Sequence, residues 1–362
     1  MLRLLTASLL FASSIALAAD TQKELQAYFE KTCESKQFMG AVGIAVNGKI
    51  VFSDACGWAD AEWSVKNTFD TRFRTGSIAK QFTATAVLLL HDQGKFELND
   101  PIGKFLPDLP DSWRSATIHQ LLTHTSGIPT YTQGPALQRF SRLGATPNEM
   151  IDSVRDKPLD FPHGTQFRYD NTGYILLGML IEKVSGLTYE HFVQQNIFDR
   201  LGMRDTGFDE QHKIIPHRAR GYTLVNGTLE NADFLDTTSA WSAGGFYSTV
   251  NDLTVWSEAL AHEKLLNPDS TQRMVTVYPE TLIQGMHYGY AVSLAERFGH
   301  ALQYHGGGIT GFQSVLQLYP DVGLVIAILS NVDSADDSPS ELIAPWTLGD
   351  DLAQIWFNGT PH

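Results

Sequence analysis

The chain has 362 residues, with 40 acidic against 26 basic side chains and a formal net charge of −14. Hydrophobic residues make up 43% and charged residues 18%, which indicates a globular protein with a large core and excludes a disordered chain. The negative charge argues against nucleic acid and anionic membrane surfaces as partners. We therefore expect a small-molecule or peptide substrate, and the sequence leaves the oligomeric state open.

Residues 1–18 are predicted to form a signal peptide. Arg3 supplies the positive start, 4–17 the apolar centre, and Ala16-Leu17-Ala18 a cleavage site of small residues. Asp20 stands where a bacterial lipoprotein would carry its lipid-bearing cysteine. No later stretch is long and apolar enough to span a membrane. We therefore expect a periplasmic or secreted protein.

The rest of the chain alternates between strand-like and helix-like patterns. Asn47-Gly48 lies between two apolar runs and predicts a β-hairpin with a type I′ turn, formed by strands 41–46 and 49–53. Hydrophobic periodicity predicts helices at 21–35, 82–90, 147–155, 171–185, 189–197, 251–262 and 341–357. Further strands are predicted at 288–294, 301–304, 312–318 and 324–329.

Strands near both ends with helices between them predict one sheet that both chain ends build. We expect residues 19–95 and 235–362 to form an α/β sheet domain, with 96–234 as an inserted, mainly helical domain. Cys33 and Cys56 are the only cysteines, and in an exported protein they can form one disulfide. Such a bond would contribute roughly 3 kcal/mol in the chain-entropy model. Two separate buried thiols are the alternative, and the sequence leaves both open.

Ser77 and Lys80 form the one S-x-x-K motif of the chain, in a glycine turn that runs into an uncharged helix. Residues three apart share a helix face, so the hydroxyl and the amine can approach each other. A serine there can attack a carbonyl, and a lysine in a partly dry, positive site can take its proton. Alone the motif is weak, because it occurs by chance about once in a chain of this size. A capping serine with a solvent-facing lysine is the alternative.

Tyr169-Asp170-Asn171 is the one Y-x-N motif and directly precedes an apolar helix. A loop tyrosine can place its phenol beside a serine, where a nearby ammonium would lower its pKa. The Asn171 amide can bind Lys80 and a substrate carbonyl. The alternative is a turn in which Asn171 caps the helix.

The segment His305-Gly306-Gly307-Gly308 follows a predicted strand. Glycines at a strand end let a ligand backbone lie close, and the Gly308 N–H can donate to a developing oxyanion. The alternative is an ordinary glycine turn.

In this order the three motifs resemble the serine β-lactamase and penicillin-binding protein superfamily. The nearest branch is the class C β-lactamase-related one, which also holds DD-peptidases, D-aminopeptidases and esterases. The resemblance covers nearly all of the mature chain and extends to the segments 121–127 and 244–249. It implies an α+β fold of β-lactamase/DD-peptidase type, with an antiparallel sheet flanked by helices.

The resemblance also implies roles for the motif residues. Ser77 would be the nucleophile, Lys80 and Tyr169 the acid/base pair, and Asn171 a support for Lys80 and substrate. The N–H groups of Ser77 and Gly308, beside Gly307, would form the oxyanion hole. Which of Lys80 and Tyr169 takes the first proton stays open. No cofactor is implied, and no histidine or cysteine spacing suggests a metal.

His305 departs from the penicillin-recognising members, whose third motif starts with lysine. Histidine is largely neutral at neutral pH, which favours peptidase or esterase activity over a genuine β-lactamase. We expect His305 to change charge near pH 6.5 and then to favour carboxylate substrates. His124, within 121–127, is expected to be structural. The predicted function is an exported serine hydrolase of amide or ester bonds. A class C-like β-lactamase and a catalytically silent penicillin-binding-like protein are the alternatives.

Overall fold

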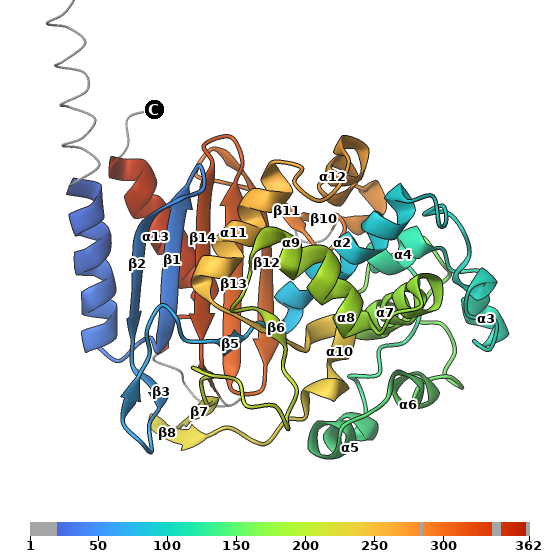
Figure 1. Ribbon diagram of the computed structural model, residues 1–362, viewed down its shortest axis with the longest axis horizontal. Coiled ribbons are helices and arrows are strands. Elements are labelled where there is room, and N and C mark those ends of the chain that lie inside the picture. Colours follow the sequence, from blue (N-terminus) through green and yellow to red (C-terminus); the bar gives the residue numbers. More distant parts are fainter. Residues whose placement is uncertain (1–19, 283–284, 335–341, 360–362) are drawn as a thin grey trace, which may run out of the picture.

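The computed structural model describes residues 20–282, 285–334 and 342–359, so the predicted signal peptide lies outside the described residues. Its centre is an antiparallel seven-stranded sheet of order β10-β11-β12-β13-β14-β1-β2 in the part of the chain described (Figure 1). The strands are β1 (Gly40–Val46), β2 (Lys49–Cys56), β10 (His287–Tyr288), β11 (Ser293–Arg297), β12 (His300–Ile309), β13 (Phe312–Tyr319) and β14 (Leu324–Ser330). This order confirms the prediction of one sheet that both chain ends build.

Helices cover the inner face of the sheet, which we define as the face that packs on α2 (Ala79–Asp92) and α11 (Val250–Ala261). Every residue of α2 from Ala79 to Leu90 is buried, as expected for a helix that is apolar all round. The other helices that follow α2 in the chain, before α13, are α3 (Asp111–Arg114), α4 (Ile118–Leu122), α5 (Pro135–Leu143), α6 (Pro147–Asp152), α7 (Asn171–Ser185), α8 (Tyr189–Val193), α9 (Asp199–Leu201), α10 (Trp241–Gly244) and α12 (Pro268–Met274). The division into two domains stays a prediction.

Short strands and turns complete the connections. The strands are β3 (Trp58–Asp60), β4 (Val65–Lys66), β5 (Phe73–Arg74), β6 (Gly207–Phe208), β7 (Tyr222–Val225), β8 (Thr228–Asn231), β9 (Phe246–Ser248) and β15 (Val332–Ser334). The 3₁₀ turns are η1 (Gly76–Ile78), η2 (Ile102–Lys104), η4 (Thr237–Ser239) and η5 (Pro279–Thr281), and η3 (Gln194–Phe198) is a π-helical turn. Within the described ranges no helix is both long and apolar enough to cross a membrane.

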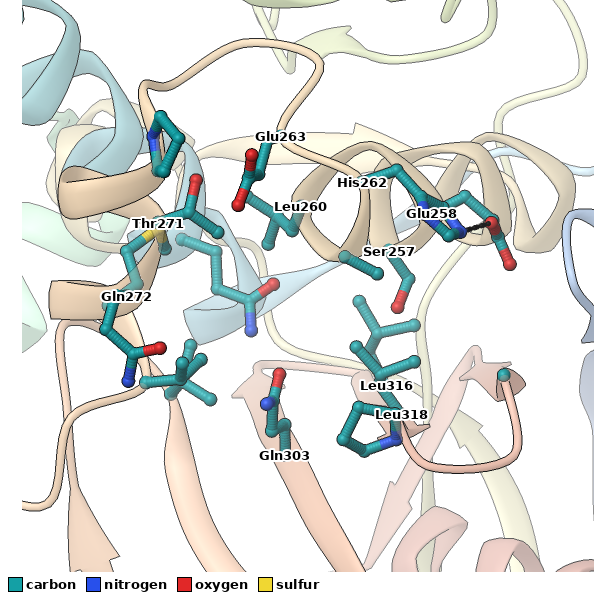
Figure 2. Close-up of a pocket in the computed structure, with 18 of the residues that line it drawn as sticks. Ser257, Glu258, Leu260, His262, Glu263, Thr271, Gln272, Gln303, Leu316 and Leu318 are labelled. Carbon is teal, nitrogen blue, oxygen red and sulfur yellow. Dashed lines mark ion pairs between the residues drawn. The ribbon is translucent and has the colours of Figure 1, made fainter.

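A cavity of about 290 Å³ separates the end of α11 from α12 and the sheet. Figure 2 shows Gln272 of α12 on one side of it and Gln303 of β12 and Leu316 of β13 on the side of the sheet. Its lining includes none of the residues that the sequence predicts to be catalytic. This cavity is therefore not the predicted catalytic site.

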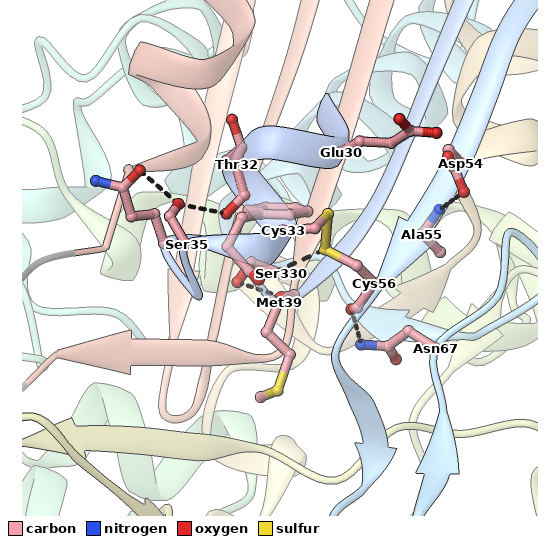
Figure 3. The surroundings of a disulfide bond; sticks show 12 residues. Glu30, Thr32, Cys33, Ser35, Met39, Asp54, Ala55, Cys56, Asn67 and Ser330 are labelled. Carbon is pink, nitrogen blue, oxygen red and sulfur yellow. Dashed lines mark hydrogen bonds between the residues drawn. A yellow bond between two sulfur atoms is a disulfide. The ribbon is translucent and has the colours of Figure 1, made fainter. Parts of the chain in front are cut away.

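The outer face of the sheet packs on an N-terminal helix, residues 20–34, and on α13 (Pro345–Gly359) (Figure 1). Leu25 and Phe29 of the first helix and Leu352 of α13 are buried in one apolar cluster with the sheet. Cys33 and Cys56 form a disulfide that joins the N-terminal helix to β2 (Figure 3). Of the two alternatives left open by the sequence, the structure has the bonded one.

Local patterns predicted several elements correctly. Asn47 and Gly48 have φ angles of 48° and 74°, as a type I′ hairpin requires. Helix α7 has the predicted limits 171–185, and Thr249 caps α11. The predicted helix 147–155 is shorter, because α6 ends at Asp152.

Two predicted segments differ from the structure because of tertiary contacts, and a third is helical as predicted but changes its helix type. The predicted strand 288–294 is divided into β10 and β11, because the Tyr290 N–H leaves the sheet and donates to the Met274 carbonyl. The predicted helix 189–197 changes from α8 to the π-helical η3. The segment 305–308 was expected to follow a strand. It lies inside β12 instead, where all four residues pair with β13.

Candidate active site

Ser77 lies in η1, directly before the buried helix α2. Gly76 has φ 51°, and a Cβ there would come within 2.8 Å of the Gly308 nitrogen. Only glycine allows this backbone to pass so close to β12. The turn therefore places Ser77 between the start of α2 and the glycine segment of β12.

Lys80 is fully buried, and its amine reaches three oxygen atoms. Its Nζ lies 2.8 Å from Asn171 Oδ1, 2.8 Å from the Ala243 carbonyl and 3.2 Å from Ser77 Oγ. Burial lowers the pKa of Lys80 to about 7, although the negative charge of Asp170 raises it. Both the ammonium and the neutral amine are therefore accessible at neutral pH.

These three partners decide where a lone pair of Lys80 would point. The Ala243 carbonyl can only accept a hydrogen bond, and Asn171 Oδ1 likewise accepts. Both need an N–H, so a neutral amine uses its two hydrogens there and turns its lone pair to the third partner, Ser77 Oγ. This geometry suits removal of the serine proton.

Tyr169 exposes 38% of its surface, and its hydroxyl is hydrogen-bonded with Ser77. Lys80 Nζ lies 4.9 Å from the centre of its ring. Although part of the residue is exposed, its ring packs on buried His124 and Lys80, and this desolvation raises the pKa of the phenol, while the hydrogen bond with Ser77 lowers it. The expectation that a neighbouring ammonium lowers the pKa of Tyr169 is therefore wrong, because the net change is upward. Tyr169 is a neutral proton donor at neutral pH.

Asp170 and Asn171 divide two roles at the start of α7. Asp170 caps the helix, because its carboxylate accepts from the N–H groups of Thr172 and Gly173 at 2.7 and 2.9 Å. The alternative in which Asn171 is the cap is therefore wrong. Asn171 Nδ2 donates to Thr132 Oγ1 at 3.1 Å, which turns Oδ1 towards Lys80.

The glycine segment of β12 packs directly on the Ser77 turn. A Cβ at Gly307 would lie 2.1 Å from the Thr75 carbonyl oxygen and 3.0 Å from the Ser77 nitrogen, so a side chain there would clash. A Cβ at Gly308 would meet nothing within 4 Å. The strand thus leaves open space beside Ser77 at Gly308, where a carbonyl oxygen could meet the two backbone N–H groups.

His305 is held as a neutral ring. Its Nδ1 lies 2.6 Å from the Gly306 carbonyl, which can only accept, so Nδ1 carries the proton and Nε2 accepts from the Tyr288 hydroxyl at 2.8 Å. Burial, together with the positive charge of Lys80, lowers the pKa of His305 to about 4. The expectation that His305 changes charge near pH 6.5 is therefore wrong.

Three further groups of this site were not predicted from the sequence to be functional. The role of Asp170 as the N-cap of α7 could have been predicted, because aspartate is a preferred residue directly before a helix. His124 was expected to be structural, and its ring lies against Tyr169 at 4.3 Å between centroids. The Ala243 carbonyl has no side-chain signature, so no sequence pattern could reveal it. Among the described residues, no cluster of three or more His, Cys, Asp or Glu could hold a metal ion.

Comparison with known proteins agrees with this geometry. The sequence pattern of the Beta-lactamase family matches residues 25–344. PbpX of Bacillus subtilis (strain 168), which carries the name of a penicillin-binding protein, is 30% identical over 298 residues, or 82% of this chain and 71% of the relative.

Two solved structures extend the comparison to amide hydrolases. A D-stereospecific amidohydrolase from Streptomyces sp. is 29% identical with a TM-score of 0.74, covering 95% of this chain and 99% of the other. The D-amino acid amidase from Ochrobactrum anthropi SV3, complexed with D-phenylalanine, has a TM-score of 0.83 at 24% identity, covering 94% and 100% of the two chains. The second likeness shows the fold.

The fold and these relatives support a serine hydrolase of amide or ester bonds. Because the family pattern spans most of the sequence, the chain belongs to the Beta-lactamase family. This confirms the resemblance to the serine β-lactamase and penicillin-binding protein superfamily and the α+β fold that it implies.

Proposed function

We propose that the chain is an exported serine hydrolase that cleaves amide or ester bonds of substrates without a carboxylate through an acyl-Ser77 intermediate. The observation that carries this proposal is the amine of Lys80, buried and directed at Ser77 Oγ by two acceptor-only partners. Export rests on the composition of residues 1–18.

The acyl transfer begins with neutral Lys80. Its lone pair takes the hydroxyl proton as Ser77 Oγ attacks the substrate carbonyl, and the N–H groups of Ser77 and Gly308 stabilise the oxyanion. Tyr169 then protonates the leaving nitrogen or oxygen and recovers a proton from Lys80. A water molecule repeats attack and proton transfer on the acyl group, which releases the acid and restores Ser77. Lys80 is the first base because its pKa lies near neutrality, whereas burial raises that of Tyr169.

The preference for substrates without a carboxylate rests on His305. Penicillin-recognising relatives place a lysine there, and a lysine attracts a substrate carboxylate. The His305 ring is neutral, and its two nitrogens are bound to the Gly306 carbonyl and the Tyr288 hydroxyl. This supports esterase- or amidase-like activity, in keeping with the name of the Streptomyces relative, a D-stereospecific amidohydrolase.

Ser77→Ala tests the nucleophile. The variant should lose turnover and fluorophosphonate labelling, read by intact mass, with a stability change of only about 1 kcal/mol because one half-buried hydroxyl is removed. Ser153→Ala, in which another helix-associated hydroxyl is removed, is the matched control and should keep both. Activity within about tenfold of wild type, roughly 1.4 kcal/mol of barrier, contradicts the assignment.

A substrate panel separates the alternatives. Nitrocefin, p-nitrophenyl esters and D-amino acid amides should be compared with the wild-type protein. We expect esters or amides to be hydrolysed faster than nitrocefin. Faster nitrocefin hydrolysis favours the β-lactamase, and the absence of both turnover and fluorophosphonate labelling favours the silent binding protein.

A further inference from the structure

His124 lies at the centre of an aromatic cluster beside Ser77. It follows α4, is 1% exposed and has φ 58°, in the left-handed region. Its ring centre is 4.3 Å from that of Tyr169, 5.0 Å from Tyr174 and 4.9 Å from Tyr288. The ring is therefore one wall of the space that holds the Tyr169 phenol.

The backbone on both sides of Tyr169 is hydrogen-bonded to His124. The Arg168 N–H donates to the His124 carbonyl at 3.0 Å. The Asp170 N–H donates to His124 Nδ1 at 3.1 Å. These two bonds and the ring contact fix the loop residue Tyr169 from three directions.

The second ring nitrogen gives independent support. Since Nδ1 accepts from a backbone N–H, the neutral ring carries its proton on Nε2. Nε2 is buried and has no hydrogen-bond partner among the described residues. Leaving such a group unpaired costs about 1–3 kcal/mol. An apolar ring would avoid this cost, so packing alone does not explain a histidine here, whereas the bond to the Asp170 N–H does.

We propose that His124 is a positioning residue that holds the Tyr169 hydroxyl against Ser77 for proton transfer. The inference rests on the proposed function and extends it to a residue that acts through Tyr169. Displacement of a catalytic group by about 1 Å can slow a reaction by roughly 100-fold. Loss of the two hydrogen bonds and the ring contact of His124 should therefore lower kcat. It should leave KM nearly unchanged, because the contacts with substrate remain.

Two variants separate the backbone clamp from the ring. His124→Asn keeps an acceptor for the Asp170 N–H and tolerates a positive φ, whereas His124→Ala loses both advantages. Both should be measured in the wild-type and the Tyr169→Phe backgrounds, with a p-nitrophenyl ester. We expect kcat to fall by up to about tenfold for His124→Asn and by about 100-fold for His124→Ala, with KM within about threefold.

The Tyr169→Phe background is decisive. A residue that acts only through Tyr169 should lower kcat there by no more than about twofold, because the hydroxyl that it positions is gone. Thr123→Ala is the matched control, since its hydroxyl bonds the His119 carbonyl and Thr125 in the same buried loop. Its effects on Tm and on rate should be the same in both backgrounds.

Losses that multiply in the double variants overturn the proposal, as does an unchanged kcat in His124→Ala. A rise in KM alone also overturns it. If His124→Ala does not fold, His124→Asn is compared in the wild-type and Tyr169→Phe backgrounds, and the fall in kcat is judged in the same way. Ser77-dependent labelling, followed in every variant, shows separately whether the proposed function holds.

Discussion

The two faces of the central sheet bury different kinds of side chain. The outer face packs apolar residues of the N-terminal helix and α13, reinforced by the disulfide Cys33–Cys56. The inner side buries Lys80, Asp170 and His305, each at most 4% exposed. Apolar burial stabilises a fold, whereas burial of an ionisable group opposes it. The outer face therefore stabilises the fold, whereas the inner face buries the ionisable groups of the candidate site and lowers stability.

The largest expected effect concerns the outer face. Replacing both Cys33 and Cys56 by alanine should lower the free energy of unfolding by about 3 kcal/mol, because the unfolded chain is no longer cross-linked. Urea unfolding measures this, and kcat/KM at 25 °C should stay at the wild-type value. Each single cysteine variant should lose the same stability. A fall in kcat/KM of the folded double variant would contradict the separation of the two faces.

The inner face should show the opposite pattern. Lys80→Ala and Tyr169→Phe should each slow acylation by about 100-fold, roughly 2.7 kcal/mol of barrier, the usual scale of general-base loss. The double variant should be little slower than the slower single one, since the two act as a unit. Pre-steady-state release of p-nitrophenol measures the step. Lys104→Ala, an exposed lysine paired with Asp100, is the control and should keep the wild-type rate. Fully additive losses would show that the two residues act independently.

This contrast also explains what the sequence could predict. Asn47-Gly48 and the apolar run of α7 are local signals, so the hairpin and the helix limits were predicted correctly. The S-x-x-K and Y-x-N spacings identified Ser77, Lys80 and Tyr169, and the structure brings them together. Their catalytic roles stay a proposal.

What the sequence could not predict depends on partners far away in the chain. The glycines from 306 to 308 suggest the end of a strand, but pairing with β13 keeps them in β12. The charge state of His305 depends on burial and on the Tyr288 hydroxyl, and neither is visible in a motif. The carbonyl that holds Lys80 comes from Ala243, whose side chain has no part in the contact.

The smallest expected effect tests how the inner face sets the charge of Lys80. In the wild type the negative charge of Asp170 raises the pKa of Lys80. Asp170→Asn removes this charge but keeps a side-chain oxygen that can cap α7. Without that charge the pKa of Lys80 falls further below about 7, so the neutral amine persists to lower pH. The acid limb of kcat/KM should move to lower pH by roughly a few tenths of a unit near pH 7, where the wild-type carboxyl is still partly ionised, and the two profiles should converge at about pH 6, where that carboxyl is protonated.

The same variant should change the pH dependence of stability. Burial raises the pKa of Asp170 to about 7, so wild-type stability falls as pH rises from the unfolded value of 3.8 towards 7, where the buried carboxyl must ionise. Asparagine does not titrate, so the variant should lose less stability across that window in urea unfolding at several pH values. Asp152→Asn, on the exposed side of α6, is the control and should reproduce the wild-type pH profile of activity. An acid limb that stays in place or moves to higher pH in Asp170→Asn would show that Asp170 only caps the helix, and that the reactivity of Lys80 is set by burial alone.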